Sequence, residues 1–161
     1  MAEKITYEQF IQSVTADNHK FTEDLHNYLI EAGCKVTFEE KKSGYLASYK
    51  FGKPLRAVMN FLFRKEGMLV RIYGEWISNY PEFLETLPAE MIQHLEGAGD
   101  CKRMTNNTCS TKCMGYDFTI ADMRFQKCRY NCFEFLITNI SKPVIKEFIA
   151  LELSARKKRA S

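Results

Sequence analysis

The chain has 161 residues, of which 45% are hydrophobic and 27% are charged, and its net charge is +3. This composition is typical of an ordinary globular domain, and no apolar run approaches the ~20 residues that a bilayer requires. The first ten residues, MAEKITYEQF, contain acids and no apolar run. We therefore expect no signal peptide, a cytoplasmic location and no membrane contact.

Apolar residues recur at helical spacing through the first part of the chain. They predict one long amphipathic helix over residues 6–32, although the polar Asp17–Asn18 pair leaves a two-helix arrangement open. His19, Glu23 and His26 share another face of this helix. Because polar residues surround them, we interpret that face as solvated rather than as a metal site.

Four alternating segments follow and predict an antiparallel sheet. They are CKVTFEE, GYLASYKF, LRAVMNFLFR and MLVRIYGEW, within residues 34–76. A short turn that contains Gly67 predicts a hairpin between the last two, with Phe63 opposite Leu69 and Phe61 opposite Arg71. Both faces of this sheet are then largely apolar, so we expect both to be covered.

The rest of the chain predicts short elements and a closing helix. Residues 80–99 indicate two short helices divided at Pro88, and YDFTI with MRFQKCRYNCFEFLIT predicts a hairpin around Ala121–Asp122. Ser141 is the expected cap of a C-terminal helix whose basic end, RKKR, we interpret as solvated.

The expected fold is a single α+β domain over residues 1–161. In it, a long N-terminal helix and a C-terminal helix pack on an antiparallel sheet. Residues 5–100 would hold the helix, the four-strand block and the short helices. Residues 101–161 would hold a Cys-rich, metal-clamped loop, the hairpin and the C-terminal helix.

Five of the six cysteines lie between Cys101 and Cys132. In a reducing compartment, such clustering favours metal ligands over disulfides, and zinc binds four thiolates in a closed tetrahedron. On one strand, Cys128 and Cys132 would be about 13 Å apart, too far to share an ion. We therefore predict a structural zinc ion whose ligands are Cys101, Cys109, Cys113 and Cys128. Cys132 and Cys34 are expected to be buried thiols.

Three alternatives remain open from the sequence. The cysteines also suit an iron–sulfur cluster, or a thiol redox sensor that uses Cys109 and Cys113. The third alternative is nucleic-acid binding by a sheet face, in which rings stack on bases and cations contact phosphates. The residues that the predicted register places on that face are Tyr45, Tyr49, Arg56 and Arg64.

No Gly-rich nucleotide-binding motif, serine-hydrolase elbow or zinc-protease motif occurs in the sequence. We therefore expect a zinc-stabilised binding or regulatory module, with a protein or nucleic-acid partner, rather than an enzyme.

The block GYLASYKFGKPLRAVMNFLFRKEGMLVRIY, followed by CKRM, MGYDF and KCRY, resembles an uncharacterised family of small bacterial proteins, mainly from Firmicutes. The resemblance covers most of the chain and implies no particular activity. Over residues 20–75 the chain also resembles, more weakly, small α+β domains of the YdhG-like kind, which implies the fold alone.

Overall fold

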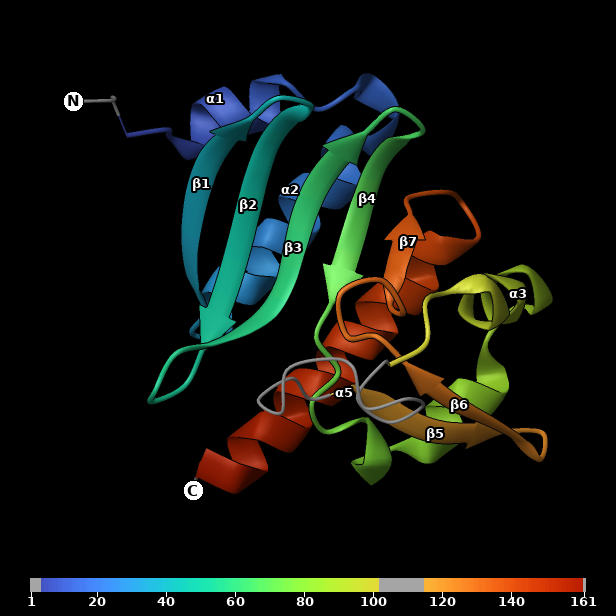
Figure 1. The fold of residues 1–161 in the computed structure, drawn as a ribbon. Coiled ribbons are helices and arrows are strands. Elements are labelled where there is room, and N and C mark those ends of the chain that lie inside the picture. Colours follow the sequence, from blue (N-terminus) through green and yellow to red (C-terminus); the bar gives the residue numbers. More distant parts are fainter. Residues whose placement is uncertain (1–3, 102–114, 161) are drawn as a thin grey trace.

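Two antiparallel sheets and a set of helices make up the protein (Figure 1), so the predicted α+β class is confirmed. The structure is a computed structural model that describes residues 4–101 and 115–160. The larger sheet has the strand order β1-β2-β3-β4-β7, and the smaller sheet pairs β5 with β6. Among the described residues, no helix has the length and apolar character needed to cross a bilayer.

The strands are β1 (Lys35–Lys41), β2 (Gly44–Phe51), β3 (Arg56–Arg64), β4 (Gly67–Ile72), β5 (Tyr116–Ile120), β6 (Met123–Lys127) and β7 (Glu134–Leu136). The helices are α1 (Tyr7–Gln12), α2 (Ala16–Glu31), α3 (Ala89–Gly97) and α5 (Ser141–Ala160), with 3-10 helices η1 (Ile77–Asn79) and η2 (Pro81–Thr86).

Two helices replace the long N-terminal helix that the sequence predicts. α1 ends at Ser13, whose hydroxyl donates to the Phe10 carbonyl at 2.6 Å, and α2 begins after Thr15, which is extended. Ser and Thr hydroxyls compete for backbone hydrogen bonds, which favours a helix boundary over a helix interior. The apolar stripe is confirmed on both helices, because Phe10, Leu25 and Leu29 are at most 2% exposed.

The helices α1, α2 and α5 lie behind one face of the larger sheet (Figure 1). The observed register places Phe61 opposite Val70 and Phe63 opposite Met68, one residue away from the predicted register. The reason is a tighter turn, since Arg64 already pairs with Gly67. A slip of one residue exchanges the two faces of a strand. Consequently Phe61, Met68 and Val70 share the buried face.

The other face of the larger sheet carries buried polar groups beside the buried Leu62 and Leu69, so the prediction of two largely apolar faces holds only in part. No described helix covers this face in Figure 1. It carries the buried carboxylate of Glu134, which forms ion pairs with Arg64 and Arg71. The Arg71 Nε–H donates to Glu134 Oε2 at 2.9 Å.

The chain crosses between the two sheets after Lys127, where the sequence predicts an unbroken strand. The Cys132 N–H donates to the Cys128 carbonyl at 3.0 Å, which closes a helical turn, and β7 then pairs with β4. Phe133 follows this turn, with its ring centroid 4.6 Å from that of Tyr116 and 4.9 Å from that of Phe148. The two sheets and α5 therefore share one core.

A candidate anion-binding cavity and the cysteine segment

A cavity of about 540 Å³ lies where the ends of the two sheets meet α5. Three arginines reach it from distant parts of the chain: Arg56 begins β3, Arg129 follows β6, and Arg156 lies on α5. The other lining residues are Phe51, Gly52, Lys53, Pro54, Glu75, Trp76, Gly115 and Tyr116. A cavity of this size is in the range that binds small molecules.

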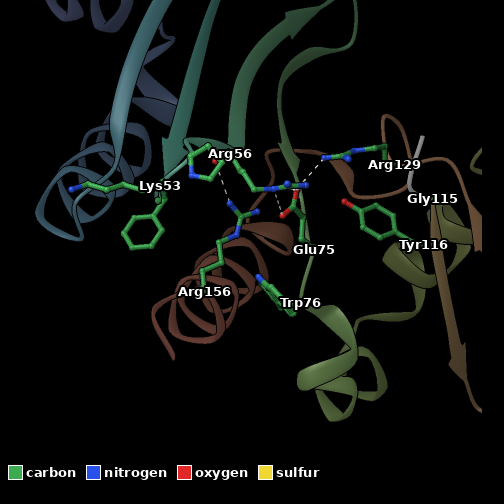
Figure 2. A pocket seen from close by; sticks show the side chains of 11 residues that line it. Lys53, Arg56, Glu75, Trp76, Gly115, Tyr116, Arg129 and Arg156 are labelled. Atoms are coloured by element: carbon green, nitrogen blue, oxygen red, sulfur yellow. Dashed lines mark hydrogen bonds and ion pairs between the residues drawn. The ribbon is translucent and has the colours of Figure 1, made fainter. Parts of the chain in front are cut away.

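Arg56 and Arg129 share one carboxylate, that of Glu75, and Figure 2 shows both guanidinium groups directed at it. Arg56 Nε lies 2.9 Å from Oε2 and Nη2 lies 3.0 Å from Oε1, a bidentate arrangement. The hydrogen bonds that Arg56 donates to Glu75 raise the pKa of Arg56. Arg129 makes one long contact, 3.4 Å from Nη2 to Oε1. Glu75 therefore satisfies Arg56 and only partly satisfies Arg129.

Arg129 has an unused donor. Its Nε–H is buried and has no hydrogen-bond partner among the described residues. The guanidinium carbon lies 5.2 Å from the ring centroid of Tyr73 and 5.8 Å from that of Tyr130, within the range of a cation–π interaction. These rings hold the side chain in place. Because a buried N–H without an acceptor is costly, an anion that reached this N–H would gain a charge-assisted hydrogen bond.

Arg156 forms a fixed part of the cavity wall. Its guanidinium donates to the carbonyls of Arg56, Ala57 and Tyr73 at 3.2, 2.8 and 2.8 Å. It also donates to the Glu152 carboxylate, 2.7 Å from Nε. Burial raises the pKa of Glu152, and hydrogen bonds that stabilise its carboxylate oppose that shift. Since Glu152 neutralises Arg156, the remaining arginines give the cavity its excess of positive charge.

Aromatic side chains complete the wall. Tyr116 is buried, its hydroxyl accepts a hydrogen bond from the Gly74 N–H at 3.0 Å, and burial raises its pKa. Trp76 and Phe51, which are half-buried, also line the cavity. Aromatic surface next to guanidinium groups suits an anion that carries a flat or apolar part.

Two of the four predicted zinc ligands lie on either side of one backbone bridge. Asp100 pairs with Lys127 in an isolated antiparallel bridge, and Cys101 and Cys128 flank this pair on the opposite face. Cys109 and Cys113 lie outside the described residues, so the four-cysteine zinc site, the iron–sulfur alternative and the redox pair stay predictions. In the part of the chain that the structure describes, no group of three metal-ligating side chains occurs.

Cys132 does not lie about 13 Å along a strand from Cys128, the distance on which its exclusion as a zinc ligand rested. Cys128 and Cys132 lie on one turn rather than on one strand. Cys132 is nevertheless fully buried, and Cys34 is 6% exposed, as the sequence predicts. Burial raises the pKa of both thiols, that of Cys34 to about 11, which makes them poor nucleophiles.

The four residues predicted to form a nucleic-acid-binding face do not share one face. Tyr45 and Tyr49 lie on the covered face of β2, and Tyr49 is fully buried. Arg64 lies on the opposite face, where it pairs with Glu134, and Arg56 lies at the cavity. The error lies in the pairing of β2 with β3, where Tyr49 is opposite Met59 and therefore shares the covered face. Nucleic-acid binding itself stays a prediction.

Most residues of the cavity were not predicted from the sequence. Arg156 belongs to the basic segment interpreted as solvated, yet it is 6% exposed. The signal for this burial was present in the sequence but was not used: Phe148, Glu152 and Arg156 follow one another at helical spacing on the apolar stripe. No local signal marks Glu75 or Arg129, because their roles depend on contacts between distant segments.

Comparisons of the chain with protein-family models, with curated protein sequences and with solved structures find no match. The resemblances to the Firmicutes family and to YdhG-like domains therefore stay predictions. The fold and the cavity define an α+β protein in which three arginines gather at one cavity.

Proposed function

We propose that the protein is a binding module for a small anionic ligand, which it holds in the cavity between its two sheets. The single observation that carries this proposal is that Arg56 and Arg129 share one carboxylate, while the Arg129 Nε–H has no acceptor among the described residues. A ligand carboxylate or phosphate supplies the missing acceptor. Charge-assisted bidentate pairs of this kind are among the strongest hydrogen bonds in proteins.

The surroundings of Arg129 favour a bound anion over a solvated one. Its side chain is 18% exposed and lies against two tyrosine rings, so little of its rotamer freedom remains to be lost on binding. Few waters compete for its donors, because the Nε atom is buried. A rigid, partly desolvated guanidinium binds oxyanions more tightly than an exposed one.

Inorganic phosphate is the first probe, and its dissociation constant can be measured by phosphorus NMR at fixed ionic strength. Arg129→Gln should weaken binding roughly tenfold, because one charge-assisted bidentate contact is lost. Glu75→Gln should strengthen binding, because the carboxylate that competes with the ligand is removed.

Arg124→Gln is the matched control. Arg124 is an exposed arginine that forms a bidentate pair with Asp117 on the smaller sheet, at 3.0 and 2.7 Å. This variant changes the net charge by the same amount away from the cavity. Equal weakening in Arg129→Gln and Arg124→Gln, or no binding by the wild type, would show the proposal to be wrong.

A structural zinc ion remains our proposal for the cysteine segment. The observation that favours it is the placement of Cys101 and Cys128 beside one Asp100–Lys127 bridge, on the same face. Four thiolates there would stabilise a polar segment that has little apolar surface to bury.

Elemental mass spectrometry of protein purified without chelator tests the zinc proposal. We expect about one zinc ion per chain. Cys128→Ser should lose the metal together with thermal stability. Cys34→Ser, a substitution of a buried residue between α2 and β1, should keep the metal. Iron in place of zinc would support the iron–sulfur alternative. A metal-free wild type would contradict both the zinc site and the iron–sulfur cluster.

A further inference from the structure

A second cavity, of about 700 Å³, adjoins the first. The two cavities have four lining residues in common, Phe51, Gly52, Lys53 and Pro54, which we call the Phe51–Pro54 wall. The wall is the connection between β2 and β3, where Gly52 adopts a φ of +99°. One ligand can therefore contact both cavities only by passing over this connection.

The second cavity is basic. Its remaining lining residues are Gly33, Lys35 and Leu55, so none of the residues around it is acidic. Lys53 belongs to both cavities, and Figure 2 shows its side chain pointing away from the Arg56–Glu75–Arg129 group. Lys35 and Lys53 are therefore the cations of the second cavity.

Three lysines of the described residues that have no ion-pair partner lie at this corner of the sheet. Lys35 lies directly opposite Lys50 in the β1–β2 pair, an arrangement of like charges that destabilises a sheet. Within the described residues, Lys35, Lys50 and Lys53 form no ion pair, whereas other cations of the sheet, such as Arg64 and Arg71, do. A bound anion would relieve the repulsion between these lysines. The fold itself supplies no reason to place like charges opposite each other here.

We propose that Lys35 and Lys53 form a second anion subsite, and that the ligand joins two or more phosphate groups across the Phe51–Pro54 wall. This inference rests on the proposed function, since the first phosphate occupies the Arg129 subsite. Lysine is a point-charge binder of phosphate, whereas arginine binds in a fixed bidentate geometry, so the two subsites suit two phosphates of one chain. Such a chain occurs in free oligophosphates and in a single nucleic-acid strand.

Orthophosphate, tripolyphosphate and a short thymidine oligonucleotide are the probes that test this inference. Tripolyphosphate should bind the wild type at least about tenfold more tightly than orthophosphate, because its second contact is intramolecular. Lys35→Gln with Lys53→Gln should remove this advantage and leave the orthophosphate affinity nearly unchanged. Lys42→Gln with Lys65→Gln is the matched control, since both lysines are exposed in turns at the other end of the sheet.

The outcomes separate the two proposals. Two results overturn the second subsite alone, provided that orthophosphate binding depends on Arg129. In the first, tripolyphosphate binds no more tightly than orthophosphate. In the second, it binds more tightly, but the Lys35 and Lys53 substitutions do not reduce this gain. Absence of any anion binding overturns both. Tighter binding of the oligonucleotide than of tripolyphosphate, lost in the same double variant, identifies a nucleic-acid strand as the source of the phosphates. The reverse order identifies a free oligophosphate.

Discussion

His26 is more buried in the fold than its polar neighbours in the sequence indicate. Polar neighbours surround it in the sequence, yet its Nδ1 lies 2.7 Å from the Tyr49 hydroxyl, and its ring stacks on Tyr7 with centroids 4.0 Å apart. The interpretation of this helix face as solvated is therefore wrong for His26. Partial burial lowers its pKa below the usual value, because the charged imidazolium loses solvation.

This lowered pKa predicts a loss of stability in mild acid. The folded state binds protons at His26 less readily than the unfolded state does, so the free energy of unfolding should fall as pH decreases below about 6.5. His26→Asn, which keeps an acceptor for Tyr49, should reduce that dependence. Urea unfolding at about pH 7.5 and about pH 5.5 measures the effect. An unchanged pH dependence in His26→Asn would contradict the prediction, and His19→Asn on the same helix is the control.

At the scale of elements, α5 is joined to the larger sheet by a buried ion pair. Glu152 is fully buried and accepts hydrogen bonds from the Trp76 N–H and the Tyr80 hydroxyl, besides the one from Arg156. Arg156 in turn donates hydrogen bonds to backbone carbonyls at the start of β3 and just after β4. The pair therefore fixes where the end of α5 lies against the cavity.

Breaking this pair should be costly. Arg156→Gln leaves the Glu152 carboxylate buried without its cation, and we expect the free energy of unfolding to fall by about 3–5 kcal/mol. Glu152→Gln combined with Arg156→Gln should cost less than the sum of the single substitutions, since neither charge is then left alone. Urea denaturation tests both variants. Lys157→Gln, at the exposed neighbouring position, should change stability by less than about 0.5 kcal/mol.

At the scale of the whole molecule, Phe133 joins the two sheets. Its ring contacts Tyr116 and Phe118 of β5 on one side and Phe148 of α5 on the other, at centroid distances of 4.6, 5.5 and 4.9 Å. Gly74 leaves room for this cluster, because a Cβ atom there would lie 3.0 Å from the Phe148 ring. The cavity lies beside this junction, so its shape depends on how the sheets meet.

Phe133→Ala should destabilise the whole protein rather than one part of it. We expect a loss of about 3–5 kcal/mol in the free energy of unfolding, from lost burial and the cavity left behind. Hydrogen exchange of the amides should lose protection in β3 and in β5 to a similar degree. Loss confined to β5 and β6 would show instead that the smaller sheet unfolds as a separate unit. Phe133→Leu is the milder variant and should lose less.

The sequence by itself determined the elements that depend on local pattern. The buried stripe of the N-terminal helices, the strand segments of the larger sheet, the turn at Ala121–Asp122 and the helix that begins at Ser141 were all predictable. Alternation and helical spacing are set by neighbouring residues, so they can be read without the rest of the chain. The burial of Cys34 was also predicted, from its distance in sequence to the other cysteines.

Only the tertiary structure decided the register of β3 with β4, the crossing between sheets after Lys127, and the cavity itself. A turn shorter by one residue reversed the faces of β4, which local pattern could not reveal because both faces carry apolar residues. Glu75 meets Arg56 across 19 positions and Arg129 across 54 positions of the sequence. Such a site exists only after distant segments have packed together. Its chemistry depends on short distances between charged groups that lie far apart in the sequence, and no local pattern relates them.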